Sequence, residues 1–287
     1  MEKILITGAN GQLGNEIKKL SENYKDFNFV YTDVNDLDIT NPLACKQFFN
    51  EIKPQFVINC AAYTAVDKAE SDADNAYRIN ATAVKNLVEA CLQCNSYFVQ
   101  ISTDYVFNGE SHLPYKETHP VSPASVYGKT KEQGEQEALK YDKSIVIRTS
   151  WLYSTFGNNF VKTMLRLGSE KESLNVIFDQ IGTPTYAEDL AATILTIADK
   201  VLNGKNEFIP GIYHYSNEGV CSWYDFAYTI MKLKELECQV NPIETKDYPT
   251  PAKRPFYSVL NKVKIKSTYG IEINHWTSSL KKMLNSI

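Results

Sequence analysis

The sequence predicts an α/β fold in which a doubly wound parallel sheet is followed by a smaller mixed domain. Short apolar runs alternate with longer amphipathic stretches through the first 150 residues, as expected when crossover helices join parallel strands. A glycine-rich turn directly follows the first apolar run. Past residue 150 the alternation loosens. We therefore assign residues 1–150 to the first domain and residues 151–287 mainly to a second region, parts of which can return to the first.

Each element is expected from its own pattern. Strands are predicted where apolar and β-branched residues cluster, at residues 3–7, 27–33, 55–62, 97–103 and 144–149. Helices are predicted where apolar residues recur at helical spacing, at residues 12–20, 42–52, 72–91 and 127–140. The later chain has helical patterns at residues 160–167, 188–202, 222–233 and 277–284. A ligand cleft is expected between the two parts, at the carboxyl ends of the strands.

Composition narrows the class of protein. The 287 residues are 43% hydrophobic and 22% charged, which suits a globular chain with a sizeable core. A net charge of −4 gives no reason to expect nucleic acid, and no apolar run is long enough to span a membrane. Six cysteines without an export signal indicate free thiols in a reducing, cytoplasmic compartment. The pair Cys91 and Cys94 has no further ligands at zinc spacing, so we predict no metal there.

The turn after the first strand has the composition of a phosphate-binding site. Gly8, Gly11 and Gly14 lie three residues apart, which permits a tight turn and brings backbone N–H groups close to a pyrophosphate at the start of the next helix. The spacing is GxxGxxG instead of the more familiar GxGxxG, and an ordinary glycine turn is the alternative. The strand before and the helix after favour a Rossmann-type dinucleotide-binding domain.

An acidic residue ends the second predicted strand. Asp33 lies about 20 residues after the last glycine of the turn, where a carboxylate accepts hydrogen bonds from the adenine ribose; a turn-forming Asp is the alternative. No Arg or Lys follows in Val34-Asn35-Asp36, so this position alone favours NADH over NADPH. Asp38, beside Ile39, would lie under the adenine or would cap the helix that begins near residue 42.

A tyrosine and a lysine provide the candidate catalytic pair. Tyr127 and Lys131 are four residues apart on one helix face, and a nearby ammonium helps a phenol of high pKa to donate a proton. Two Tyr-x-x-x-Lys pairs occur in the chain, and we interpret Tyr228 with Lys232 as part of a packed helix face. Only the first follows the strand that ends at Thr103, whose hydroxyl could polarise a substrate carbonyl.

The sequence resembles the extended short-chain dehydrogenase/reductase superfamily and, within it, the dTDP-4-dehydrorhamnose reductase family. Motifs of other enzyme classes (GxSxG, GxxxxGK[ST] and HExxH) are missing, and the four histidines are scattered. The likeness runs nearly end to end and is carried by residues 61–70 (AAYTAVDKAE), 102–107 (STDYVF), 148–151 (RTSW), 158–160 (NNF) and 249–255 (PTPAKRP).

The resemblance implies NAD(P)H-dependent reduction of the C4 ketone of dTDP-4-dehydro-L-rhamnose to dTDP-L-rhamnose, a precursor of surface polysaccharide such as the O-antigen of lipopolysaccharide. By this likeness, the cofactor-contacting positions are Gly11, Gln12, Leu13, Asp33, Asp38, Ile39, Ala62, Tyr63, Thr64, Tyr127 and Lys131. The substrate-contacting positions are Thr103, Asp104 and Trp151, and Arg254 could pair with the diphosphate.

Proteins that share this resemblance have several different functions. Sugar-nucleotide 4,6-dehydratases resemble the family but place Asp-Glu after the threonine, whereas Tyr105 follows Asp104 in this chain, which favours simple reduction. Another nucleotide-sugar oxidoreductase or epimerase remains an alternative, as does a non-catalytic subunit like the regulatory subunit of methionine adenosyltransferase. Some members of the family are linked to Mg²⁺ and dimerisation through glutamates. Glu16 and Glu188 stand at matching places, but Ser286 replaces the third glutamate, so we predict no bound metal and leave a homodimer open.

Overall fold

The computed structural model describes residues 1–287, and a six-stranded parallel sheet forms its centre. The strands follow the spatial order β10-β5-β4-β3-β1-β2. Their bounds are β1 (Glu2–Thr7), β2 (Phe27–Thr32), β3 (Phe56–Asn59), β4 (Tyr97–Thr103), β5 (Ser144–Thr149) and β10 (Gly211–His214). Because β2 and β3 leave β1 on opposite sides, the strand order reverses there, and a crevice opens at the carboxyl ends.

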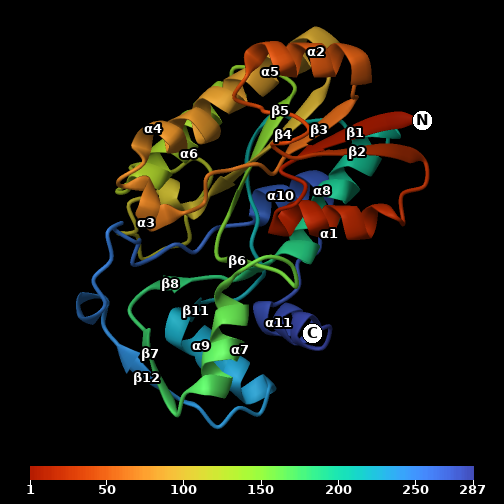
Figure 1. Cartoon of the computed structure of the whole chain (residues 1–287). Coiled ribbons are helices and arrows are strands. Elements are labelled where there is room, and N and C mark those ends of the chain that lie inside the picture. The colour runs from red at the N-terminus through yellow and green to blue at the C-terminus, as the bar shows by residue number, and fades with distance from the viewer.

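Helices cover both faces of this sheet (Figure 1). One face carries α1 (Gln12–Ser21), α8 (Ala187–Leu202) and α10 (Val263–Tyr269). The other carries α2 (Pro42–Ile52), α5 (Ala83–Cys94) and α6 (Val126–Ala138). The chain therefore returns to the sheet after residue 150, because β10, α8 and α10 all come from its later part.

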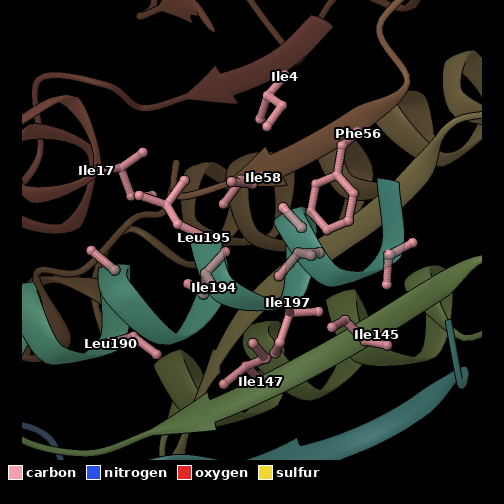
Figure 2. Packing of buried hydrophobic residues seen from close by; sticks show 14 of the residues in the cluster. Ile4, Ile17, Phe56, Ile58, Ile145, Ile147, Leu190, Ile194, Leu195 and Ile197 are labelled. Atoms are coloured by element: carbon pink, nitrogen blue, oxygen red, sulfur yellow. The ribbon is translucent and has the colours of Figure 1, made fainter. Parts of the chain in front are cut away.

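Alternation along the strands divides the core between the two faces. Ile4 and Ile6 point toward α8, whereas Leu5 points toward α2 and α5. Figure 2 shows side chains of the sheet facing α8 side chains such as Ile194 and Ile197, all of them fully buried. The sheet is apolar on both faces, as expected for parallel strands covered by helices on each side.

Short polar side chains start several of the helices. Asn41 accepts hydrogen bonds from the N–H groups of Leu43 and Ala44 at the start of α2, and Ser125 accepts one from Gly128 N–H at the start of α6. Such caps satisfy backbone donors that the first helical turn leaves unpaired. The start of α6 matters most, because Tyr127 lies in its first turn.

The segment between β3 and α5 is less regular than predicted. A single helix was expected over residues 72–91, but the chain forms α3 (Val66–Ala69), α4 (Ala73–Tyr77) and a π-helical turn (Arg78–Thr82) before α5. The Asn80 side chain joins this turn to the segment after β3, because it accepts from the Tyr63 N–H and donates to the Tyr63 C=O. β3 is likewise shorter than the predicted 55–62. These irregular residues lie beside the crevice, a common place for π-turns.

A second lobe is built from three helices and three small two-stranded sheets (Figure 1). Its helices are α7 (Phe160–Glu170), α9 (Trp223–Leu233) and α11 (Trp276–Leu284). Its strand pairs are β6 (Leu152–Tyr153) with β9 (Thr185–Tyr186), β7 (Ser173–Ile177) with β12 (Gln239–Ile243), and β8 (Ile181–Gly182) with β11 (Cys221–Ser222). Two short 3-10 turns complete the chain: Asp104–Val106 directly follows β4 of the central sheet, and Thr245–Asp247 follows β12. None of the helices is long and apolar enough to cross a bilayer.

Candidate active site

A cavity of about 270 Å³ opens at the carboxyl ends of β1, β2 and β3. Gly8 has a left-handed φ of +65°, and a Cβ there would lie 2.6 Å from Ala61 Cα. Gly14 is equally confined, since a Cβ there would lie 2.6 Å from the Ala9 backbone, and Gly11 N–H closes the turn on Gly8 O at 3.1 Å. The backbone of β1, the turn and α1 therefore approach one another closely, leaving room for a pyrophosphate beside the α1 N-terminus.

The acidic end of β2 lines the same cavity. Asp33 accepts hydrogen bonds from Asn10 N–H at 3.0 Å and Val34 N–H at 2.8 Å. Asp38 also lines the cavity and accepts from Thr40 N–H and Oγ1 at 2.9 and 2.7 Å, which holds the pKa of its carboxyl below the usual value. Because Asn41 caps α2, Asp38 does not serve as its N-cap.

The remaining predicted cofactor residues surround this cavity at different depths. Ile39 and Ala62 line it directly. Leu13 is buried beneath the turn, and Gln12 accepts a hydrogen bond from Asn159 Nδ2 at 3.1 Å, which links α1 to the second lobe. Tyr63 and Thr64 do not line the cavity: Thr64 is exposed, and Tyr63 is half-buried with its hydroxyl donating to Asp72 at 3.0 Å.

Tyr127 and Lys131 lie one turn apart on α6, beside the end of β4. Burial raises the pKa of Tyr127 to about 12, and the neighbouring Thr103 hydroxyl acts in the opposite direction. Burial also lowers the pKa of Lys131 to about 8, against the attraction of Glu135. We expected Lys131 to lower the pKa of the phenol. Instead, the Lys131 ammonium donates to the backbone carbonyl of Ile101 at 2.7 Å, and burial dominates at Tyr127.

The second Tyr-x-x-x-Lys pair is placed quite differently. Tyr228 lies on α9 in the second lobe and is 44% exposed, with the Lys232 ammonium 5.5 Å above its ring. Our interpretation of this pair as a packed helix face was therefore wrong for Tyr228, whose ring faces solvent because the buried face of α9 is formed by Phe226 and Ile230. The pair lines neither the cavity at the carboxyl ends of β1, β2 and β3 nor the larger cavity of the second lobe.

Thr103 ends β4, and Asp104 begins the 3-10 turn that follows, both close to Tyr127. Thr103 Oγ1 donates to Asp104 Oδ1 at 3.0 Å and accepts from Tyr105 N–H at 3.2 Å. Asp104 is buried, and this burial raises the pKa of its carboxyl to about 6, against the opposing effect of the nearby Ser258 and Thr103 hydroxyls. The hydroxyl hydrogen of Thr103 is thus directed at a neighbouring carboxyl group.

Sequence analysis missed a buried ion pair directly beneath this group. Glu135 accepts from Arg148 Nε at 2.8 Å and Nη2 at 2.6 Å, and from Ser102 Oγ at 2.5 Å. Both charged side chains are about 2–3% exposed. Because Glu135 follows Lys131 by four residues, the face of α6 that carries Tyr127 continues into this pair. That spacing was the available signal, but the Arg148 partner on β5 could not be read from it.

A larger cavity of about 590 Å³ lies in the second lobe, and Trp223 and Arg254 are among its lining residues. Trp151 stacks on Trp223 with ring centroids 3.6 Å apart and has a φ of +48°, unusual for a bulky residue. Arg254 makes a two-pronged ion pair with Asp67 of α3, at 3.0 and 2.7 Å. The structure therefore places Arg254 between the two lobes, where its guanidinium already has a carboxylate partner.

The glutamates considered for Mg²⁺ do not form a suitable metal site. Glu188 accepts from the ammonium groups of Lys19 at 2.7 Å and Lys282 at 2.6 Å, which outweigh burial and hold the pKa of this carboxyl below its usual value. Glu16 instead accepts from Ser154 Oγ at 2.6 Å. Two ammonium groups already neutralise the one carboxylate, so these residues do not fit a divalent cation.

A parallel sheet with a glycine turn and an acidic β2 end, and a Tyr-Lys pair beside β4, defines an oxidoreductase of the short-chain dehydrogenase/reductase class. Comparison with protein families agrees, because the pattern described as RmlD substrate binding domain matches residues 1–287. The chain belongs to this family, in which curated members are named dTDP-4-dehydrorhamnose reductases.

Individual relatives match over nearly the whole chain. The dTDP-4-dehydrorhamnose reductase of Aggregatibacter actinomycetemcomitans is 44% identical, with 99% of this chain and 98% of that protein covered. A Streptomyces antibioticus protein named as a probable dTDP-4,6-dihydroxy-2-methyloxan-3-one 4-ketoreductase is 38% identical, with 99% and 95% covered. The crystal structure of dTDP-4-dehydrorhamnose reductase from Bacillus anthracis in complex with NADP superposes with a TM-score of 0.94 at 39% identity, covering 100% of this chain and 99% of that one.

Proposed function

We propose that this protein reduces the C4 ketone of dTDP-4-dehydro-L-rhamnose to dTDP-L-rhamnose with NADH or NADPH. The observation that carries the proposal is the position of Tyr127 beside Thr103 at the carboxyl end of β4, in a chain of this family. The neighbouring strand β3 ends at the dinucleotide cavity. The reduced nicotinamide supplies the hydride when it is bound. We also propose a cytoplasmic location, and a homodimer remains a prediction.

The chain's own residues divide the work between two lobes. Gly8, Gly11 and Gly14 shape the turn for the pyrophosphate, and Asp33 would accept hydrogen bonds from the adenine ribose. Tyr127 would donate the proton that the new alkoxide needs. Because its surroundings raise the pKa of the phenol to about 12, the tyrosine is protonated at neutral pH and ready to donate.

Lys131 and Thr103 would support that donation from two sides. The Lys131 ammonium donates to the Ile101 carbonyl of β4, and from there it would hold the nicotinamide ribose and bring positive charge near the phenolate. The Thr103 hydroxyl lies near the phenol and lowers its pKa. Both side chains are nearly buried, so water is kept from the reacting group.

Residues around the second-lobe cavity would bind the nucleotide-linked sugar. Trp151 offers a flat apolar ring to a deoxysugar, and its stacking on Trp223 holds the ring in place. Asp104 would contact the sugar beside the reacting carbon. Arg254 would bind the diphosphate by sharing its guanidinium with Asp67, since five N–H donors allow two anionic partners.

The test measures oxidation of reduced nicotinamide by absorbance with dTDP-4-dehydro-L-rhamnose, using NADH and NADPH separately. Tyr127→Phe should lower the rate by at least about a hundredfold, because general acid catalysis contributes on that scale. Tyr228→Phe is the matched control, since Tyr228 has the same Lys spacing but lies away from both cavities. No oxidation with either cofactor, despite cofactor binding, would refute the proposed substrate.

A second candidate is 4-ketoreduction of a different dTDP-linked deoxysugar. The Streptomyces antibioticus relative, at 38% identity, carries a name of this kind. This second candidate function predicts a higher kcat/KM with another dTDP-4-keto sugar than with dTDP-4-dehydro-L-rhamnose. Tyr127→Phe should still abolish turnover. An epimerase would interconvert sugars without net consumption of cofactor, and a regulatory subunit would bind cofactor without turnover and copurify with a larger enzyme.

A further inference from the structure

A carboxylate of the first lobe holds the loop at residues 249–255, which contains no helix or strand. Asp67, on the short helix α3, accepts from Arg254 Nη1 at 3.0 Å, from Arg254 Nη2 at 2.7 Å and from Ala252 N–H at 3.2 Å. These are the only hydrogen bonds that join residues 249–255 to the rest of the chain. Asp67 therefore determines where the loop presents its arginine.

The guanidinium of Arg254 keeps one edge free of hydrogen bonds within the protein. An arginine has five N–H donors in a planar fork. In Arg254, two of them go to Asp67 and one goes to the Ala252 carbonyl at 3.2 Å. The donors that remain are Nε–H and the second hydrogen of Nη2, which share one edge of the plane and can bind two phosphate oxygens together. Arg254 lines the second-lobe cavity and its side chain is 23% exposed, whereas Asp67 does not line that cavity.

We propose that Asp67 is a positioning residue for substrate binding, which holds the Nη1–Nη2 end of Arg254 so that the Nε–Nη2 edge is available to the diphosphate of the nucleotide-linked sugar. This inference deepens the proposed reductase function and rests on it. The substrate need not displace Asp67, because the carboxylate and the diphosphate use different edges of the same guanidinium. The hydrogen bond from Arg254 holds the pKa of Asp67 below its usual value, so the pair is ionised at neutral pH.

Two effects of Asp67 on the diphosphate oppose each other, and the exposure of the carboxylate decides between them. Its negative charge repels the diphosphate, whereas its hydrogen bonds order a long side chain and a loop before the substrate arrives, which lowers the entropy cost of binding. The Asp67 side chain is 41% exposed, so its charge is screened at physiological salt. Positioning should therefore predominate, and loss of the carboxylate should weaken substrate binding.

The experiment compares kcat and KM for the dTDP-4-keto sugar in wild type and Asp67→Asn at about 150 mM salt, where exposed charges are screened. Asparagine keeps the size of the side chain but has one acceptor atom, so it cannot hold both Nη groups as the carboxylate does. KM should rise about three- to tenfold, the scale of ordering one long side chain, while kcat should stay within about twofold. Asp74→Asn, at an exposed aspartate of α4, is the matched control and should change neither constant.

The outcomes separate this inference from the proposed function. A wild type that reduces no dTDP-4-keto sugar would refute the proposed function itself. An active wild type whose KM is unchanged in Asp67→Asn would refute only the role of Asp67. A lower KM in that variant would also overturn the inference, because it would mean that the carboxylate repels the diphosphate more than it positions Arg254.

A double-variant cycle distinguishes positioning from a purely structural role. Arg254→Gln alone should raise KM for the sugar by at least about tenfold, because it removes charge-assisted hydrogen bonds to the diphosphate. In that background Asp67→Asn should raise KM no further, since Asp67 acts only through Arg254. A further rise in the double variant, or a higher KM for NADPH in Asp67→Asn, would overturn the inference, because either result would mean that Asp67 supports the fold and not the arginine.

Discussion

Removal of the Glu135 charge should destabilise the protein strongly. Glu135 and Arg148 form a two-pronged ion pair at 2.6 and 2.8 Å with side chains that are only 2–3% exposed, and Ser102 donates a further hydrogen bond. Glu135→Gln keeps the shape of the side chain but leaves the Arg148 guanidinium buried without a counter-charge. Breaking one partner of a buried pair costs about 3–5 kcal/mol, so we expect a loss of that size in the free energy of unfolding.

Urea denaturation followed by circular dichroism gives the free energy directly. Glu137→Gln is the matched control on the same helix, because it removes a 2.7 Å pair with Lys140, whose side chain is 66% exposed. Exposed pairs contribute about 0–1 kcal/mol. The reasoning would be refuted if Glu135→Gln lost less than about 1 kcal/mol, comparable with the surface control.

A double variant separates the charge from the packing. Glu135→Leu with Arg148→Met replaces both charges by apolar side chains, so no unpaired charge stays buried. Such replacements are often neutral or stabilising. The double variant should therefore recover most of the stability that Glu135→Gln loses. A double variant as unstable as the single one would mean that cavity formation, and not the unpaired charge, caused the loss.

Four further outcomes follow from the site. Gly8→Ala should weaken NADH binding, measured by fluorescence titration, by at least about tenfold with an intact circular dichroism spectrum, because φ is +65° and Ala61 leaves no room. NADH should give a higher kcat/KM than NADPH, since Asp33 meets the ribose without a cationic clamp; equal values would contradict this. Burial lowers the pKa of Lys131 to about 8, so the ammonium is lost above that pH and kcat should fall there, a fall that Lys131→Arg should remove. Excess chelator should leave activity unchanged, because Lys19 already neutralises Glu188; restoration of lost activity by Mg²⁺ would refute this.

Local features of this protein could be predicted from the sequence alone. The alternation of apolar runs and amphipathic stretches predicted all five strands of the first domain, and four central strands lie within three residues of the expected bounds. The glycine turn and the Tyr127–Lys131 pair were equally accessible, because the residues concerned lie within a few positions of each other. Strand and helix periods are short-range properties, so they survive in the order of the residues.

Contacts between distant segments had to be supplied by the tertiary structure. Trp151 stacks on Trp223, Glu188 joins Lys19, and β10 completes the sheet beside β5, all across long stretches of chain. The protonation behaviour of the site belongs to the same group, because the pKa values of Tyr127 and Lys131 follow from how deeply other segments bury them. Burial and long-range pairing depend on how the whole chain packs, and no spacing of residues along a single segment encodes them.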